Sequence, residues 1–307
     1  MRLSARLPVL AVACLAAVVR PATAGCTLSA VATLPLTISG PRLYVPISMN
    51  DTEGQFMVDT GAGETVLMAP YAARAHVGMD IHAGQKILSG VGGRESLPVN
   101  SSHVRRIKVG QIAFQDWEFA VMPDNGSGIS KSAQDGVLGM DFLHYFDMDV
   151  DVEAHKLTLW RVTGCKDIHP EWQGPYDTIP LSGNSNHGAN IPILVDNAIL
   201  DVAFDTGMVG VLLSRDAAAK AGVTDAMLLK DEAGRGAGVG GKFPSVLHRF
   251  NMMMVGNSEI DHPKVDVETE SHRVWYSNGL IEWRYLKARR FWVSFTTQSL
   301  FVQGTGK

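Results

Sequence analysis

Phe56-Met-Val-Asp59-Thr-Gly-Ala62 returns 146 residues later in the chain as Val202-Ala-Phe-Asp205-Thr-Gly-Met208. In both copies an apolar run, typical of a buried strand, leads into Asp-Thr-Gly, which is typical of a tight turn. The likeness extends upstream, where Pro46 and Pro192 each stand 13 residues before the Asp of their copy. A duplicated unit with one carboxylate per copy predicts that the carboxyls of Asp59 and Asp205 meet.

Two carboxyls about 3 Å apart cannot both ionise, so they share one proton and can act together as base and acid. In this interpretation each Asp supplies the carboxyl, the Thr a hydroxyl at the strand end, and the Gly backbone freedom for the turn. The alternative is a pair of unrelated surface turns, each capped by its Asp. The register of the two copies within a longer repeat favours the paired carboxyls.

A further element, Asp135-Gly-Val-Leu-Gly139-Met-Asp-Phe142, completes a resemblance to the aspartic proteases of the pepsin and retropepsin type. The chain is similar to bacterial, exported retropepsin-like proteins that carry two lobes in one chain. The resemblance implies an all-β fold of two similar β-barrel lobes with a substrate cleft between them. It also implies that Asp59 and Asp205 are catalytic, and that the neighbouring residues brace the two loops: Thr60, Gly61, Thr206 and Gly207.

The expected organisation is a signal peptide over residues 1–24, a first lobe over 25–160, a connection over 161–189 and a second lobe over 190–307. Residues 25–43 are expected to begin as an irregular lead into the first strand. Residues 104–112 are expected to form one strand, and residues 69–77 a short surface helix.

Glycine-rich hairpin tips recur in the two copies, and we interpret them as flaps that hydrogen-bond an extended substrate through their backbone. Ordinary hairpin turns are the alternative. The second tip also fits the dinucleotide pattern G-x-G-x-x-G, but no apolar strand precedes it and no helix can follow it. The predicted flap residues are Gly90, Val91, Gly92, Gly93, Gly238, Val239, Gly240 and Gly241.

The second copy departs from the first in its closing element. Aligned on Gly279, Glu282 stands where the first copy has Gly139, and Arg284 stands where it has Asp141. A Glu here would displace the Asp205 turn, point outward, or form an ion pair with Arg284 or Arg289. Met208 also replaces the usual small residue after Asp-Thr-Gly.

The first 24 residues resemble a secretory signal, with a basic start, an apolar run over residues 7–19 and the small-residue site Ala22-Thr-Ala24. Cys26 and Cys165 would then remain, and an even pair in an exported chain favours a disulfide worth about 4–5 kcal/mol from loop closure. A lipid anchor on Cys26 is the alternative. We expect an exported protein, periplasmic or secreted.

The net charge is −4 over 307 residues, and removal of the signal makes it more negative because only basic residues are lost. This balance argues against nucleic acid or anionic membrane as the partner. The ten histidines form no H-E-x-x-H motif, so neither a metal nor another cofactor is predicted. No further stretch is long and apolar enough to span a membrane.

The leading hypothesis is a monomeric aspartic endopeptidase acting on peptides or proteins. A pseudoprotease that binds extended peptides without cutting them is the second hypothesis, motivated by Glu282 and Met208. A dimer in which lobes of two chains pair is the third. Because neither Ala62 nor Met208 offers a hydroxyl to the carboxyls, the pH optimum should lie nearer neutrality than that of a pepsin.

Overall fold

The computed structural model describes residues 25–78, 85–88, 97–123, 134–183, 189–234, 236–238, 241–270 and 277–304. The predicted signal peptide lies outside these residues. The described chain is mostly β-structure, which confirms the predicted all-β class. No helix in this part of the chain has the length and apolar character needed to cross a membrane.

A ten-stranded sheet dominates the first half of the chain, and we call it with its helices the first lobe. Its strands are β2 (Thr37–Ser39), β3 (Arg42–Met49), β4 (Thr52–Val58), β5 (Val66–Met68), β6 (Gln85–Leu88), β7 (Leu97–Val104), β8 (Ile107–Val109), β9 (Ile112–Phe114), β10 (Trp117–Met122) and β11 (Gly136–Leu138). Its helices are α1 (Ala69–Arg74) and α3 (Met140–Leu143).

A nine-stranded sheet forms the second lobe. Its strands are β15 (Ala189–Val195), β16 (Ala198–Asp205), β17 (Val211–Leu213), β18 (Glu232–Ala233), β21 (Ser245–Arg249), β22 (Met252–Val255), β23 (Ser258–Asp261), β24 (Lys264–Glu268) and β25 (Gly279–Glu282). The lobe also carries a two-stranded hairpin and three short helices: β19 (Ala237–Gly238), β20 (Gly241–Lys242), α4 (Arg215–Lys220), α5 (Asp225–Leu228) and the 3-10 helix η1 (Trp283–Leu286).

The two sheets have the same strand order, position by position. The first runs β6-β7-β10-β5-β11-β4-β3-β8-β9 and the second β18-β21-β24-β17-β25-β16-β15-β22-β23. The parallel pairs also correspond, since β4 with β11 matches β16 with β25, and β5 with β10 matches β17 with β24. The sequence repeat is therefore a repeat of the fold.

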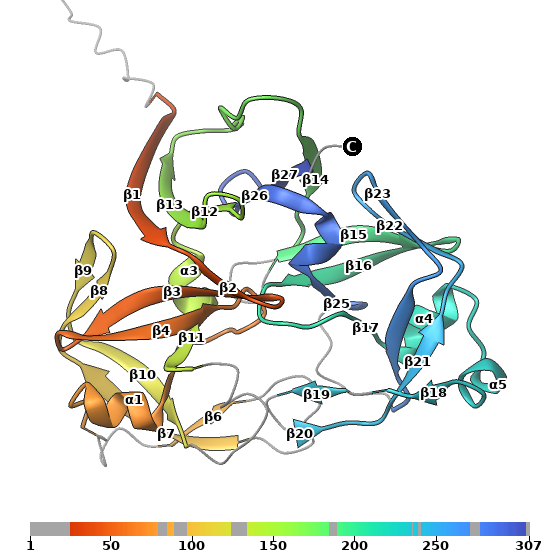
Figure 1. The fold of residues 1–307 in the computed structure, drawn as a ribbon, viewed down its shortest axis with the longest axis horizontal. Helices are drawn as coiled ribbons and strands as arrows, with labels where there is room; N and C mark the ends of the chain where they lie inside the picture. The colour runs from red at the N-terminus through yellow and green to blue at the C-terminus, as the bar shows by residue number, and fades with distance from the viewer. Residues whose placement is uncertain are drawn as a thin grey trace, which may run out of the picture.

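A six-stranded sheet joins the lobes, and it lies at the top of Figure 1 between them. Its order is β1 (Thr27–Pro35), β13 (Lys156–Thr163), β12 (Asp147–Asp151), β26 (Ala288–Ser294), β27 (Ser299–Gly304) and β14 (Asp177–Pro180). Strand β12 pairs with β26, so the sheet is made from both halves of the chain. One hydrophobic core runs through this sheet and both lobes, which favours one rigid unit.

The disulfide between Cys26 and Cys165 is present and ties the start of β1 to the segment after β13. This confirms the predicted pairing. It also uses the sulfur atom that a lipid anchor on Cys26 would need.

Two local predictions are wrong. Residues 25–43 are not an irregular lead, because β1 pairs along its length with β13 and β2 pairs with β3. The first four residues of β1 are exposed, so this edge strand lacks the alternation that marks a strand in sequence. Residues 104–112 are not one strand, because β7 ends at Val104 and β8 and β9 form a hairpin around Gly110, whose φ is +58°.

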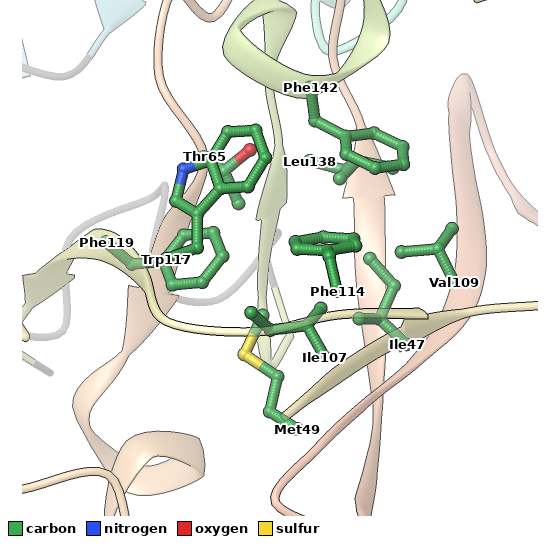
Figure 2. Close-up of a pocket in the computed structure, with 10 residues that line it drawn as sticks. All are labelled: Ile47, Met49, Thr65, Ile107, Val109, Phe114, Trp117, Phe119, Leu138 and Phe142. Atoms are coloured by element: carbon green, nitrogen blue, oxygen red, sulfur yellow. The ribbon is translucent and has the colours of Figure 1, made fainter. Parts of the chain in front are cut away.

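A small cavity of about 10 Å³ lies inside the first lobe (Figure 2). Apart from Thr65, its lining side chains are hydrophobic, and they include Phe114, Trp117 and Phe142. The cavity has too little polar lining to hold an ordered water. It marks the packing of aromatic side chains against β11 and α3, which contribute Leu138 and Phe142 to its lining.

Candidate active site

The two predicted aspartates stand at equivalent strand ends. Asp59 follows β4 directly, and Asp205 is the last residue of β16. The amide of Asp59 donates to the carbonyl of Leu138 on β11 at 3.1 Å, which holds the strand end in the sheet. Below, the Asp59 loop means residues 59–65, and the Asp205 loop means residues 205–211.

The threonines join the two loops through four hydrogen bonds related by symmetry. The Thr60 hydroxyl donates to the carbonyl of Phe204 at 2.6 Å and accepts the amide of Thr206 at 3.1 Å. The Thr206 hydroxyl in turn donates to the carbonyl of Val58 at 2.7 Å and accepts the amide of Thr60 at 3.1 Å. Both threonines are buried, so water cannot supply hydrogen bonds to these groups. The four bonds satisfy donors and acceptors that would otherwise lack partners.

Gly61 and Gly207 bring each loop against the carboxyl of the other. A Cβ on Gly61 would lie 2.3 Å from Oδ2 of Asp205, and one on Gly207 would lie 2.2 Å from Oδ2 of Asp59. Neither glycine has a positive φ. The expectation that glycine serves backbone freedom here is therefore wrong, because the position requires the missing side chain instead.

The carboxyls of Asp59 and Asp205 are hydrogen-bonded to each other. Burial raises the pKa of Asp59, while the hydrogen bond from Asp205, the amides of Gly61 and Ala62 and the charge of Arg42 oppose the rise. The pKa of Asp205 is raised well above its ordinary value, first by burial and then by the charge of Asp59. The pKa of Asp205 is thus raised more than that of Asp59, and burial is the first cause for both carboxyls.

Two backbone amides act on each carboxyl, those of Gly61 and Ala62 on Asp59 and those of Gly207 and Met208 on Asp205. Oδ1 of Asp59 accepts the amides of Gly61 and Ala62, both at 2.9 Å, and Oδ1 of Asp205 accepts the amide of Gly207 at 2.8 Å. No side-chain hydroxyl donates to either carboxyl among the described residues. These amides favour the ionised form of both carboxyls and oppose the effect of burial.

In the first lobe, α3 and the end of β11 support the Asp59 loop. The amide of Gly139 donates to the Thr65 hydroxyl at 3.0 Å, and that hydroxyl donates to Oδ1 of Asp141 at 2.6 Å. A Cβ on Gly139 would lie 2.6 Å from the backbone of Glu64. Gly139 thus packs against the loop as predicted, and no larger residue fits there.

In the second lobe a glycine and a glutamate have exchanged places. Glu282 occupies the position of Gly139, while Gly210 occupies the position of Glu64. With a φ of +86°, Gly210 turns its amide toward the Glu282 carboxylate and donates to Oε2 at 2.7 Å. A Cβ on Gly210 would meet no atom within 4 Å, so glycine is needed here for its positive φ, which directs the amide to the buried Glu282 carboxylate.

Of the outcomes considered for Glu282, the ion pair is the one observed. Its carboxylate accepts Nε and NH2 of Arg284, and its side chain is 1% exposed, so it does not point outward. The threonine hydrogen bonds are symmetric, so the Asp205 loop is not displaced. Arg289 pairs with Glu153 instead.

We expect Arg284→Gln to lower the free energy of unfolding by about 1–3 kcal/mol, because it leaves a buried carboxylate without its cation. The half-exposed guanidinium keeps the effect below that of a fully buried pair. The double variant Glu282→Gln/Arg284→Gln should recover most of the loss, since the amide oxygen can still accept the Gly210 amide. Urea unfolding at pH 7 measures both.

Arg289→Gln is the matched control, because it removes the same charge from an exposed pair and should change stability by less than about 0.5 kcal/mol. Equal losses in the single and double variants would contradict the assigned role of the ion pair.

The predicted flaps are described only in part. Gly90, Val91, Gly92, Gly93, Val239 and Gly240 lie outside the described residues. Gly238 and Gly241 pair across the β19–β20 hairpin, and the amide of Gly236 donates to the Ser245 hydroxyl at 3.0 Å. In Figure 1 this hairpin and β6 lie on the side of the molecule away from the six-stranded sheet.

Sequence reasoning missed two features of the site. One is the Gly210–Glu282 exchange, which the repeat itself would have revealed had Glu64 been aligned with Gly210. The other is Arg42, whose charge acts on Asp59. The register of the β3–β4 pair could have identified Arg42. This residue is the first of β3 and lies opposite the end of β4, where Asp59 follows. Among the described residues, no three His, Cys, Asp or Glu side chains are grouped to hold a metal ion.

Comparison with known proteins gave one family match and no match to a curated protein. Residues 45–145 match the family model described as "gag-polyprotein putative aspartyl protease". The matched segment contains the Asp59 loop and the Gly139 element that supports it. Residues 45–145 are therefore similar to a retropepsin-like aspartic protease domain.

Proposed function

We propose that this protein is an aspartic endopeptidase whose site is made by both lobes of one chain. The observation that carries the proposal is the hydrogen-bonded pair of Asp59 and Asp205 at equivalent strand ends. One buried proton between two carboxyls provides a base and an acid at the same point. The site needs no second chain, so we propose a monomer.

In the proposed reaction the Asp59 carboxylate takes a proton from a water molecule, whose oxygen attacks the peptide carbonyl carbon. Asp205 donates its proton to the carbonyl oxygen, which gives a neutral tetrahedral diol. Asp59 then returns its proton to the amide nitrogen while Asp205 accepts one from a diol hydroxyl. The C–N bond breaks, and the pair is restored to its starting state with one proton.

The proposal extends to the place of action and to the domain boundaries. The disulfide supports an oxidising compartment, which agrees with export by a signal at residues 1–24. We propose a periplasmic or secreted enzyme with lobes at 25–160 and 190–307, joined by 161–189. The glycine tips would hold the peptide extended.

Cleavage of a mixed peptide library by the protein lacking residues 1–24, between pH 3 and 8, tests the proposal. Cleavage that disappears in Asp205→Asn supports it. Peptide binding without cleavage by the wild type would favour a pseudoprotease, and cleavage that survives the substitution would assign the activity elsewhere.

The pH optimum should lie nearer neutrality than that of a pepsin. Burial raises the pKa of both aspartates. Among the described residues, only backbone amides donate to the Oδ1 atoms of the two carboxyls. Ala62→Ser would add a hydroxyl donor to the Asp59 carboxylate, favour its ionised form, and move the acidic limb of the pH profile down by roughly one unit.

The exposed Ala73→Ser on α1 is the control and should leave the profile in place. Rates of wild type and both variants across pH 3–8 decide the matter. A wild-type maximum near pH 3 would refute the expectation.

A further inference from the structure

Arg42 lies on the face of the first sheet that carries Asp59. In the β3–β4 ladder Tyr44 stands opposite Met57, and the strands are antiparallel. Two residues before Tyr44 thus correspond to two residues after Met57, which brings Arg42 level with Asp59. Side chains two apart on a strand share a face, so Arg42 projects to the same side as the Asp59 carboxyl.

The guanidinium of Arg42 has donors that the described protein does not use. Its Nε is buried without a hydrogen-bond partner, and no ion pair involving Arg42 is found among the described residues. Oδ1 of Asp59 is already occupied by two amides, and the carboxyl is also hydrogen-bonded to Asp205. Donors of a half-buried guanidinium that find no acceptor raise the free energy of the folded protein, and a bound anion would supply the missing acceptors.

The repeat does not carry the Arg42 cation into the second copy. The repeat places Gly188 at the position that corresponds to Arg42, so the second copy has no equivalent side chain. The whole chain is acidic, with a net charge of −4, and so does not attract anions in general. A preference for an anionic group that depends on Arg42 would therefore distinguish one direction along a bound peptide.

We propose that Arg42 binds a carboxylate of the peptide substrate, on the first-lobe side of the bond that is cut. The inference rests on the proposed peptidase function and assigns its substrate class. Arginine and carboxylate form paired, charge-assisted hydrogen bonds, whose geometry a glutamine in the substrate cannot reproduce. The carboxylate has two possible sources: an Asp or Glu side chain near the cut, or the free C-terminus of a short peptide.

Three kinds of peptide that share one cleavage site from the library separate these sources. The first has Gln on either side of the site and an amidated C-terminus. The second replaces one Gln by Glu, at each position in turn, and the third has a free C-terminus placed close to the site. We expect the wild type to prefer a carboxylate peptide about ten- to hundredfold in kcat/KM over the neutral one.

Arg42→Gln should reduce that ratio to near one, and Arg42→Lys should retain part of it. The control is Arg106→Gln, which removes the same charge at the far end of β3, where Arg106 pairs with the exposed Asp51. It should keep the wild-type ratio. Because each ratio is taken at one pH within one variant, a general change in the reactivity of Asp59 cancels.

The outcomes separate the two proposals. Cleavage with equal ratios in wild type and Arg42→Gln overturns the carboxylate site and leaves the peptidase standing. If the wild type cuts no peptide, the peptidase fails, and the same ratios are taken from dissociation constants by calorimetry. Carboxylate preference that depends on Arg42 in binding then supports the site, and equal or absent binding overturns it.

Discussion

Asp205→Asn is expected to abolish peptide cleavage and at the same time to raise the free energy of unfolding at neutral pH. Activity should fall at least about 10³-fold, because the pair loses the proton that Asp205 donates. It thereby loses the combination of one acid and one base that the reaction requires. Asn is nearly the same size, so the threonine hydrogen bonds between the loops remain. Loss of activity then reports chemistry rather than unfolding.

The stability gain follows from the sign of the pKa shift. Burial and the Asp59 charge raise the pKa of Asp205 in the folded state well above its unfolded value. The folded state thus holds a proton that the unfolded state releases above about pH 4, so stability falls as pH rises toward the folded pKa. Asn does not titrate, and its advantage should be absent below pH 4 and grow toward neutrality.

Urea unfolding at pH 4 and pH 7 measures this difference. Asp59→Asn should show the same direction with a smaller gain, because the pKa of Asp59 is raised less. Asp225→Asn is the opposing control, since the hydrogen bond and charge of Arg215 lower the pKa of that exposed carboxylate. An Asp205→Asn variant less stable than wild type at pH 7 would contradict the assignment of the proton to Asp205.

Thr60→Ala is expected to damage both stability and activity, and Thr206→Ala should match it. Each change removes one hydroxyl that serves two buried hydrogen bonds, and Thr60→Ala leaves the Phe204 carbonyl and the Thr206 amide without partners. Two buried backbone groups left unsatisfied cost about 2–4 kcal/mol in the free energy of unfolding. The loops that hold the carboxyls lose part of their connection, so kcat should fall more than KM rises.

Thr60→Ser keeps the hydroxyl and is the control for the methyl group. The double variant Thr60→Ala/Thr206→Ala should lose less than the sum of the single variants, because the four bonds belong to one network. Unfolding free energies and kcat of all four proteins give the coupling. Equal activity of Thr60→Ala and Thr60→Ser would show that the hydroxyl does not position the carboxyls.

The predictions from sequence succeeded where the signal was local or repeated. The apolar runs before Asp59 and Asp205, and the helix after Met68, follow from short-range patterns that burial in the fold preserves. They failed where an element depends on a distant partner. Strand β1 has little alternation, and its hydrogen bonds come from β13, which lies more than a hundred residues further along the chain.

Glu282 illustrates why the site could be only partly predicted. The alignment identified the departure from Gly139, and the ion pair with Arg284 was one of the outcomes considered. The compensating change, Gly210 for Glu64, lies 72 residues away from Glu282 in sequence. Its effect depends on a positive φ that no spacing rule reveals.

By itself, the sequence determined that this protein is an all-β, two-lobed chain with one aspartate at an equivalent strand end in each half. Alternation and repetition are properties of neighbouring residues, so they can be read before folding. Only the tertiary structure decided how burial and charge shift the pKa values of the two carboxyls, how the second lobe accommodates Glu282, and that Arg42 stands level with Asp59. Each of these depends on burial and on charges brought together across the sheets, and such interactions arise only when distant segments pack.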